Sequence, residues 1–144
     1  MTGLLIVVGV LALSTVLGLV YRGRQGAFRT GAIAPTLALA PTMRDELAAL
    51  GADPGARATL LQFSSAFCAP CRATRRVLGE VTELVNGVAH VEVDAEQHLE
   101  LVRRLGISKT PTTLVLDADV REVTRASGQP RKADVLAALG QALP

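Results

Sequence analysis

The chain has 144 residues, 49% of them hydrophobic, and a formal net charge of +2 at pH 7. That length predicts one domain of ordinary size. Nucleic-acid binding usually relies on a strongly basic surface and on aromatic side chains that stack on bases. With a charge so near zero, no Trp, one Tyr and three Phe, we expect no nucleic acid among the partners.

Much of the hydrophobic content lies at the N-terminus, where residues 3–20 read GLLIVVGVLALSTVLGLV without a charge. With Thr2 and Tyr21 added, a helix of this length reaches about 30 Å, which matches the hydrocarbon core of a bilayer. The strongest alternative is a cleaved signal peptide, which favours a basic residue before the run and a small-x-small site directly after it. No basic residue precedes the run, and the nearest such site, at 38–40, lies well downstream. We therefore expect residues 1–21 to form a retained, single-pass transmembrane helix.

The residues after this span predict its orientation. Arg22, Arg24 and Arg29 follow it, and no basic side chain precedes it, so the positive-inside rule places the C-terminal part in the cytoplasm. An extracytoplasmic domain remains the alternative. Residues 22–41 contain three Gly and two Pro and are expected to form a linker, which is compatible with a short edge strand near 27–30 or 36–40.

Residues 42–144 alternate between helical and strand patterns. Thr42 is expected to cap the first helix. The hydrophobic periodicity and the turn residues predict the order helix, strand, helix, strand, helix, strand, strand, helix. The expected ranges are 43–50, 57–64, 69–84, 88–94, 95–105, 112–116, 120–126 and 131–143. This order predicts an α/β fold with a central mixed sheet and helices on both faces.

The chain contains two cysteines, Cys68 and Cys71, separated by Ala69 and Pro70. They follow a predicted strand and open a predicted helix, a context typical of a redox pair. The first turn of a helix carries N–H groups without intrahelical partners and a partial positive charge. A thiolate at Cys68 is stabilised there, so its pKa should fall below the usual value of about 8.5. Pro70 fits the first helical turn because it lacks an N–H.

The pattern resembles the thioredoxin family over residues 42–144. The residues that carry the resemblance are 59–72 with the two cysteines, Val91 to Asp94, Gly106 to Thr112, and Ser127-Gly128. It implies a thioredoxin fold in which Cys68 attacks a substrate disulfide and Cys71 resolves the mixed disulfide. It further implies that Pro111 follows a cis peptide bond beside the cysteines. The substrate would lie against Phe67, Ala69, Pro70, Thr110 and Pro111, with the Thr110 backbone pairing to an extended peptide.

This sequence departs from the family at three positions. Phe67 replaces the usual Trp, and Gln62 replaces the carboxylate that many members bury behind the second cysteine. Because an amide cannot take up a proton, the usual base for Cys71 is absent. His90 falls where the lysine partner of that carboxylate often lies. Our hypothesis is that His90, or water held by Gln62, assists proton transfer at Cys71. The alternative is that His90 is an inert strand residue.

The sequence therefore predicts a membrane-tethered thiol–disulfide oxidoreductase that reduces protein disulfides. Proline between the cysteines resembles the reducing members of the family. No cofactor is expected, and electrons would come from an upstream reductase or another dithiol protein. Two alternatives belong to other classes. One is a non-catalytic membrane adaptor, and the other is a zinc site shared between two subunits, since two thiolates are half of a four-thiolate site.

Overall fold

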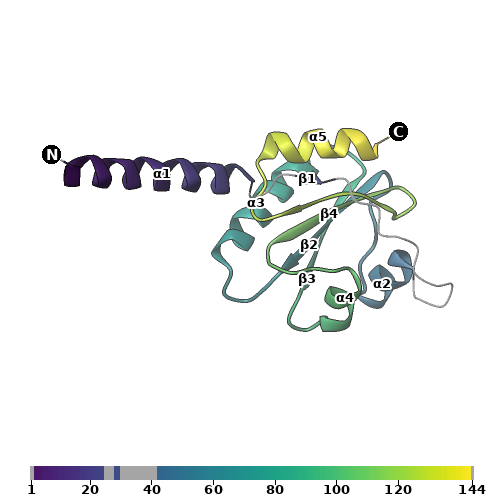
Figure 1. Ribbon diagram of the computed structural model, residues 1–144. Coiled ribbons are helices and arrows are strands. Elements are labelled where there is room, and N and C mark those ends of the chain that lie inside the picture. Colours follow the sequence, from purple (N-terminus) through teal and green to yellow (C-terminus); the bar gives the residue numbers. More distant parts are fainter. Residues whose placement is uncertain (1, 25–27, 30–41, 144) are drawn as a thin grey trace.

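The computed structural model describes residues 2–24, 28–29 and 42–143. Its elements, labelled in Figure 1, are α1 Thr2–Arg24, β1 Phe28–Arg29, α2 Met43–Ala49, β2 Ala58–Ser64, α3 Ala69–Leu84, β3 Val88–Asp94, α4 Leu99–Arg104, β4 Thr112–Asp117, β5 Glu122–Ser127 and α5 Lys132–Ala142.

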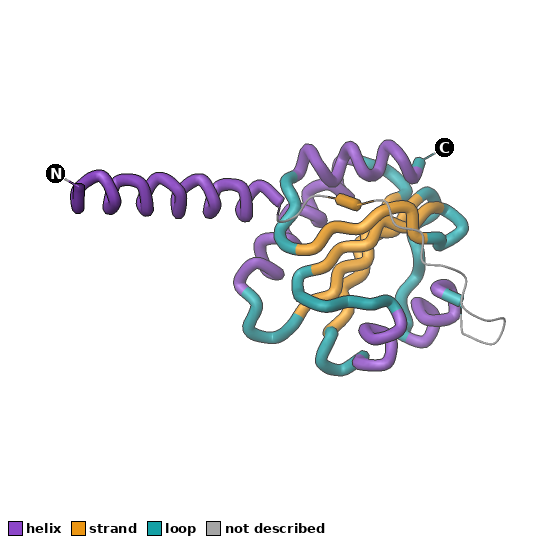
Figure 2. Tube along the Cα trace, in the orientation of Figure 1, coloured by secondary structure: helices purple, strands orange, loops and turns teal. Residues whose placement is uncertain are grey.

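The strands form one mixed sheet in the order β1-β5-β4-β2-β3, drawn in orange in Figure 2. Strands β2 and β3 run parallel, whereas β4 is antiparallel to both β2 and β5. Short strand β1 pairs with β5 through Phe28 and Ala126, in one of the two stretches that were compatible with an edge strand. The other stretch, residues 36–40, lies outside the described residues.

Strand β2 is the centre of the molecule, and all seven of its residues are buried. Its side chains alternate between the two faces, as strand geometry requires. Leu61 and Phe63 pack with residues of α2 and α4 on one face, and Leu60 packs with residues of α3 and α5 on the other. Helices therefore cover both faces of the sheet (Figure 1), and the predicted α/β architecture is confirmed.

Most element boundaries agree with the expected ranges to within one or two residues. Thr42 caps α2 as predicted: its hydroxyl accepts a hydrogen bond from Asp45 N at 3.3 Å, and the Asp45 carboxylate accepts one from Thr42 N at 2.9 Å. The exception is α4, expected over 95–105 but found over Leu99–Arg104. Asp94 accepts hydrogen bonds from Glu96 N and the Gln97 side chain, both at 2.9 Å. These hydrogen bonds hold residues 95–97 in a turn, so α4 begins later than expected.

Helix α1 differs from the other helices in its surroundings. Its side chains are described over residues 6–20, and all of them are exposed. In Figure 1 the helix extends away from the sheet. No helix is both long and apolar enough to cross a membrane over the residues that the structure describes. The transmembrane helix at 1–21 and the linker at 22–41 therefore remain predictions from the sequence.

Candidate redox site

The loop after β2 delivers Cys68 to the N-terminus of α3. Cys68 is the N-cap residue, with φ −102° and ψ 98°, and Pro70 lies in the first helical turn. The Cys71 backbone N–H donates a hydrogen bond to Cys68 Sγ at 3.1 Å. The same N–H also donates to the Cys68 carbonyl at 3.1 Å, so this first-turn donor is shared between the two atoms. Its contact with the sulfur, at the positive end of the helix dipole, favours a thiolate at Cys68.

The two cysteines form a disulfide with a Cα–Cα distance of 5.2 Å. Cys68 is partly exposed, whereas Cys71 is only 2% exposed. A disulfide from another molecule could therefore reach Cys68 but not Cys71. This asymmetry matches the roles that the resemblance implies, with Cys68 attacking first and Cys71 resolving afterwards.

The loop before β4 lies beside this pair. The Thr110–Pro111 peptide bond is cis, as the resemblance implied. The hydroxyls of Ser65 and Thr110 are 3.1 Å apart, a hydrogen bond that ties this loop to the loop carrying the cysteines. Pro111 is buried and Thr110 is partly buried.

The remaining residues predicted to bind substrate are exposed. Ala69 and Pro70 are both on the surface, and the side chain of Phe67, directly before Cys68, is fully exposed at 101%. Cys68 is thus flanked by an exposed apolar rim formed by Phe67, Ala69 and Pro70. The role of this rim in substrate binding remains a prediction.

Behind Cys71 the structure brings Gln62 and His90 together. Gln62 is fully buried, and its Nε2 donates hydrogen bonds to Ser64 Oγ at 2.7 Å and to the Cys71 carbonyl at 3.0 Å. Its Oε1 lies 3.1 Å from His90 Nε2. Because an amide oxygen only accepts hydrogen bonds, His90 Nε2 must carry the proton. Gln62 therefore fixes the first turn of α3 to β2 and β3.

His90 is held in its neutral form. Burial lowers its pKa, Glu92 acts in the opposite direction, and Arg75 lowers it further. With Nε2 already protonated and bonded to Gln62, His90 Nε2 is not free to take a proton from Cys71. The hypothesis that His90, or water held by Gln62, assists proton transfer at Cys71 is not tested by this geometry, which does give both residues a structural role.

Two further charged residues lie next to this cluster and were not singled out from the sequence. Arg75 on α3 makes two hydrogen bonds to the Glu92 carboxylate on β3, at 2.5 and 2.7 Å. Partial burial raises the pKa of Glu92, but the hydrogen bonds and the charge of Arg75, with Ser64 and His90 nearby, outweigh it, and the pKa is lowered overall. The signal in the sequence was the strand periodicity, which places Glu92 on the same side of β3 as His90.

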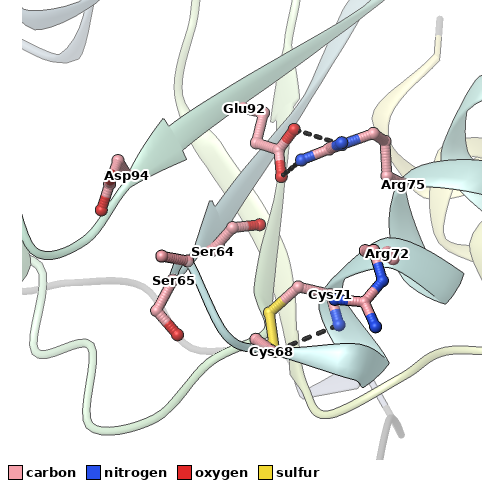
Figure 3. Close-up of a pocket in the computed structure, with 9 residues that line it drawn as sticks. Ser64, Ser65, Cys68, Cys71, Arg72, Arg75, Glu92 and Asp94 are labelled. Carbon is pink, nitrogen blue, oxygen red and sulfur yellow. Dashed lines mark hydrogen bonds and ion pairs between the residues drawn. A yellow bond between two sulfur atoms is a disulfide. The ribbon is translucent and has the colours of Figure 1, made fainter.

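A pocket of about 400 Å³ opens beside the disulfide. Figure 3 shows the residues that line it: Ser64, Ser65, Ala66, Cys68, Cys71, Arg72, Arg75, Glu92 and Asp94. Except for Ala66 and the cysteines, every one of these side chains is polar or charged. The buried cysteine thus borders a polar, accessible cavity.

A family model described as a thioredoxin-like domain matches residues 48–143. The chain belongs to the thioredoxin-like family. Its pair Cys68 and Cys71, joined as a disulfide, is consistent with thiol–disulfide redox activity. No curated protein matches the sequence.

Solved structures of thioredoxins share the fold. The thioredoxin NaTrxh from Nicotiana alata is 19% identical, with a TM-score of 0.57 over 72% of this chain and 89% of its own. The thioredoxin from Fasciola hepatica is 18% identical, with a TM-score of 0.56 over 69% of this chain and 90% of its own. At these identities the likeness concerns the fold alone.

Proposed function

We propose that this thioredoxin-like protein is a thiol–disulfide oxidoreductase that reduces disulfides in other proteins. The observation that supports it most directly is the hydrogen bond from the Cys71 N–H to Cys68 Sγ at the start of α3. The same donor would stabilise a Cys68 thiolate in the reduced protein and make it a nucleophile near neutral pH.

The reaction has two exchange steps. The Cys68 thiolate attacks one sulfur of a substrate disulfide, forming a mixed disulfide and releasing the other substrate sulfur as a thiolate. Cys71 then attacks Cys68 Sγ, which forms the Cys68–Cys71 disulfide and releases the second substrate sulfur. The substrate gains two electrons and the protein loses two. An upstream dithiol protein or reductase must restore the reduced pair, and no cofactor takes part.

Two features of the surface support a protein substrate. The exposed Phe67 offers an apolar contact next to Cys68, and an extended peptide could pair with the backbone of Thr110 beside the cysteines. Both contacts suit a polypeptide that carries a disulfide.

Insulin reduction by dithiothreitol tests this function. The wild-type chain should accelerate insulin precipitation, and Cys68→Ser should abolish the acceleration. If both behave alike and neither accelerates, the non-catalytic adaptor becomes the better account. Zinc analysis of the same purified protein addresses the shared metal site, which predicts one zinc ion per two chains.

We also propose that residues 1–21 tether the domain to a lipid bilayer. Two features support this proposal: the uncharged run at 3–20 and the exposed apolar side chains of α1, among them Leu11 at 62% and Leu13 at 69%. Exposed apolar surface on this scale is stabilised by contact with lipid.

Cell fractionation tests the tether. The full chain should sediment with membranes and resist alkaline extraction, whereas a chain lacking residues 1–24 should remain in the supernatant. Equal partitioning of the full and the shortened chain would contradict the tether but would leave the redox proposal unaffected. Reporters fused to the C-terminus would then separate a cytoplasmic domain, which Arg22, Arg24 and Arg29 favour, from an extracytoplasmic one.

A further inference from the structure

The resolving step raises a question of proton transfer. Cys71 is 2% exposed and must lose its thiol proton before it can attack Cys68. Gln62, which lies directly behind it, cannot accept a proton, and the His90 nitrogen that contacts Gln62, Nε2, already donates to it. The pocket that Cys71 borders contains other candidate acceptors.

Two carboxylates line that pocket, and their orientations differ. Asp94 is directed toward the turn after β3, where it binds Glu96 N and the Gln97 side chain. Glu92 is held against α3 by Arg75, which lies one helical turn after Cys71. Figure 3 shows this difference: Asp94 lies off to one side, and Glu92 faces the helix that carries Cys71.

The hydrogen bonds of the buried cluster lead to the side of the pocket where Glu92 lies. His90 donates to Gln62, and Gln62 donates to Ser64, which lines the pocket together with Glu92. Arg75 donates two hydrogen bonds to the Glu92 carboxylate. A carboxylate has about four acceptor sites, so these two hydrogen bonds leave room for a further proton donor. Glu92 is therefore a carboxylate of this pocket that can accept one.

We propose that the Glu92 carboxylate accepts the thiol proton of Cys71 in the resolving step. This inference rests on the proposed oxidoreductase function. The sulfur electron pair of Cys71 forms a bond to Cys68 Sγ, and the bond between Cys68 and the substrate sulfur breaks, with its electron pair leaving on the substrate. The proton passes from Cys71 to Glu92 through the solvent-accessible pocket and then to solvent or to the departing thiolate.

The charges around Glu92 keep it ready for this role. Arg75 and Arg72 from α3 and His90 and Asp94 from β3 are the charged or titratable groups beside it. Partial burial raises the pKa of Glu92, but Arg75, together with Ser64 and His90, keeps it below its usual value. Glu92 is therefore ionised before the step and returns the proton quickly afterwards.

Stopped-flow reaction with less than one equivalent of dithiobis(nitrobenzoate) separates the two steps. Attack by Cys68 releases the first nitrothiobenzoate, and attack by Cys71 releases the second. Because nitrothiobenzoate leaves without needing a proton, the second phase reports on the proton of Cys71. Failure of the first phase would contradict the proposed function, whereas a change confined to the second phase concerns this inference.

Glu92→Ala should leave the first phase unchanged and slow the second by about 100-fold, the lower end of what a positioned base contributes. Glu80→Ala is the matched control, since Glu80 on α3 forms an exposed ion pair with Lys132 on α5 at 2.9 Å. This control should show both phases at wild-type rates.

Acetate distinguishes a proton acceptor from a structural residue. It should enter the open pocket of Glu92→Ala, bind the vacated Arg75, and restore the second phase in proportion to its concentration. In Arg75→Gln the acid limb of the second phase should move to higher pH, because loss of the cation raises the pKa of Glu92. A second phase in Glu92→Ala at the wild-type rate, or slowed but insensitive to acetate, would overturn the proposal.

Discussion

The two cysteines of one disulfide occupy opposite environments. Cys68 is partly exposed beside the uncovered Phe67, and its sulfur accepts a backbone N–H. Cys71 is buried, and its carbonyl accepts a hydrogen bond from Gln62 within a polar cluster. The first environment favours a charged sulfur that meets other molecules, whereas the second favours a neutral thiol that acts only inside the protein.

This difference supports the proposed order of the chemistry. The dipole and the first-turn N–H groups of α3 act on the sulfur that lies at the start of the helix, and the N-cap position belongs to Cys68. Cys71 lies one turn further and depends on its neighbours for deprotonation. The variants below break or sharpen this comparison, from the largest expected effect to the smallest.

Serine substitutions should separate the cysteines most sharply. Cys68→Ser should lose all turnover and form no mixed disulfide, because the exposed nucleophile is gone. Cys71→Ser should also lose turnover but accumulate a stable mixed disulfide with insulin chains, visible by non-reducing electrophoresis. A mixed disulfide that accumulates in Cys68→Ser instead would reverse the assigned order.

The polar cluster behind Cys71 can be broken at Gln62. Gln62→Leu leaves Ser64, the Cys71 carbonyl and His90 Nε2 without their partner. Each unsatisfied buried group costs about 1–3 kcal/mol, so the free energy of unfolding should fall by about 3 kcal/mol in urea titrations.

Thr113 is the matched control for Gln62. It is directly opposite Gln62 in the β2–β4 register, and its buried hydroxyl has no hydrogen-bond partner among the described residues. Thr113→Val should therefore be neutral or stabilising. Equal destabilisation of the two variants would show that packing, and not hydrogen bonding, matters at this level of the sheet.

The exposed rim of Cys68 can be tested at Phe67. Phe67→Ala should raise the KM for insulin by about 3- to 10-fold, because a partly covered aromatic ring contributes about 1 kcal/mol of apolar contact. Phe67→Leu should retain most of the affinity, and the rate with a small disulfide should change little in either variant. An unchanged KM for insulin in Phe67→Ala would remove this residue from the substrate surface.

The smallest expected effect concerns pH. Burial lowers the pKa of His90 below its usual 6.5, so the unfolded chain takes up this proton more readily than the folded one. The free energy of unfolding should therefore decline as the pH falls from 6.5 toward the pKa of His90 in the folded protein. His90→Gln should lose this part of the decline. The lowered pKa of Glu92 acts in a lower range, below about 4.5.

Much of the domain could be predicted because local signals and tertiary packing agree. The limits of α3 and β3 and the cap at Thr42 follow from hydrophobic periodicity and capping chemistry. Helix α4 could not be placed correctly, because its length depends on where the Asp94 side chain forms hydrogen bonds. The Cys68–Cys71 pair could be identified from the sequence because the two cysteines are three positions apart, within one helical turn.

The polar surroundings of Cys71 were harder to predict. Gln62 and His90 were identified by their positions, but the partners of each nitrogen and oxygen depend on three elements that meet in space. Arg75 and Glu92 are 17 positions apart in the sequence, and their pairing depends on how α3 packs over β3. Strand periodicity could place Glu92 on a face but could not identify the cation opposite it.

The acidity of Cys68 tests the central claim most directly. Thiolate absorbance of the reduced Cys71→Ser variant, followed across pH, gives the pKa of Cys68 without interference from the second sulfur. The account predicts a value at least one unit below about 8.5, the usual value for a free cysteine. A pKa at or above that value would contradict the assignment of Cys68 as the activated nucleophile.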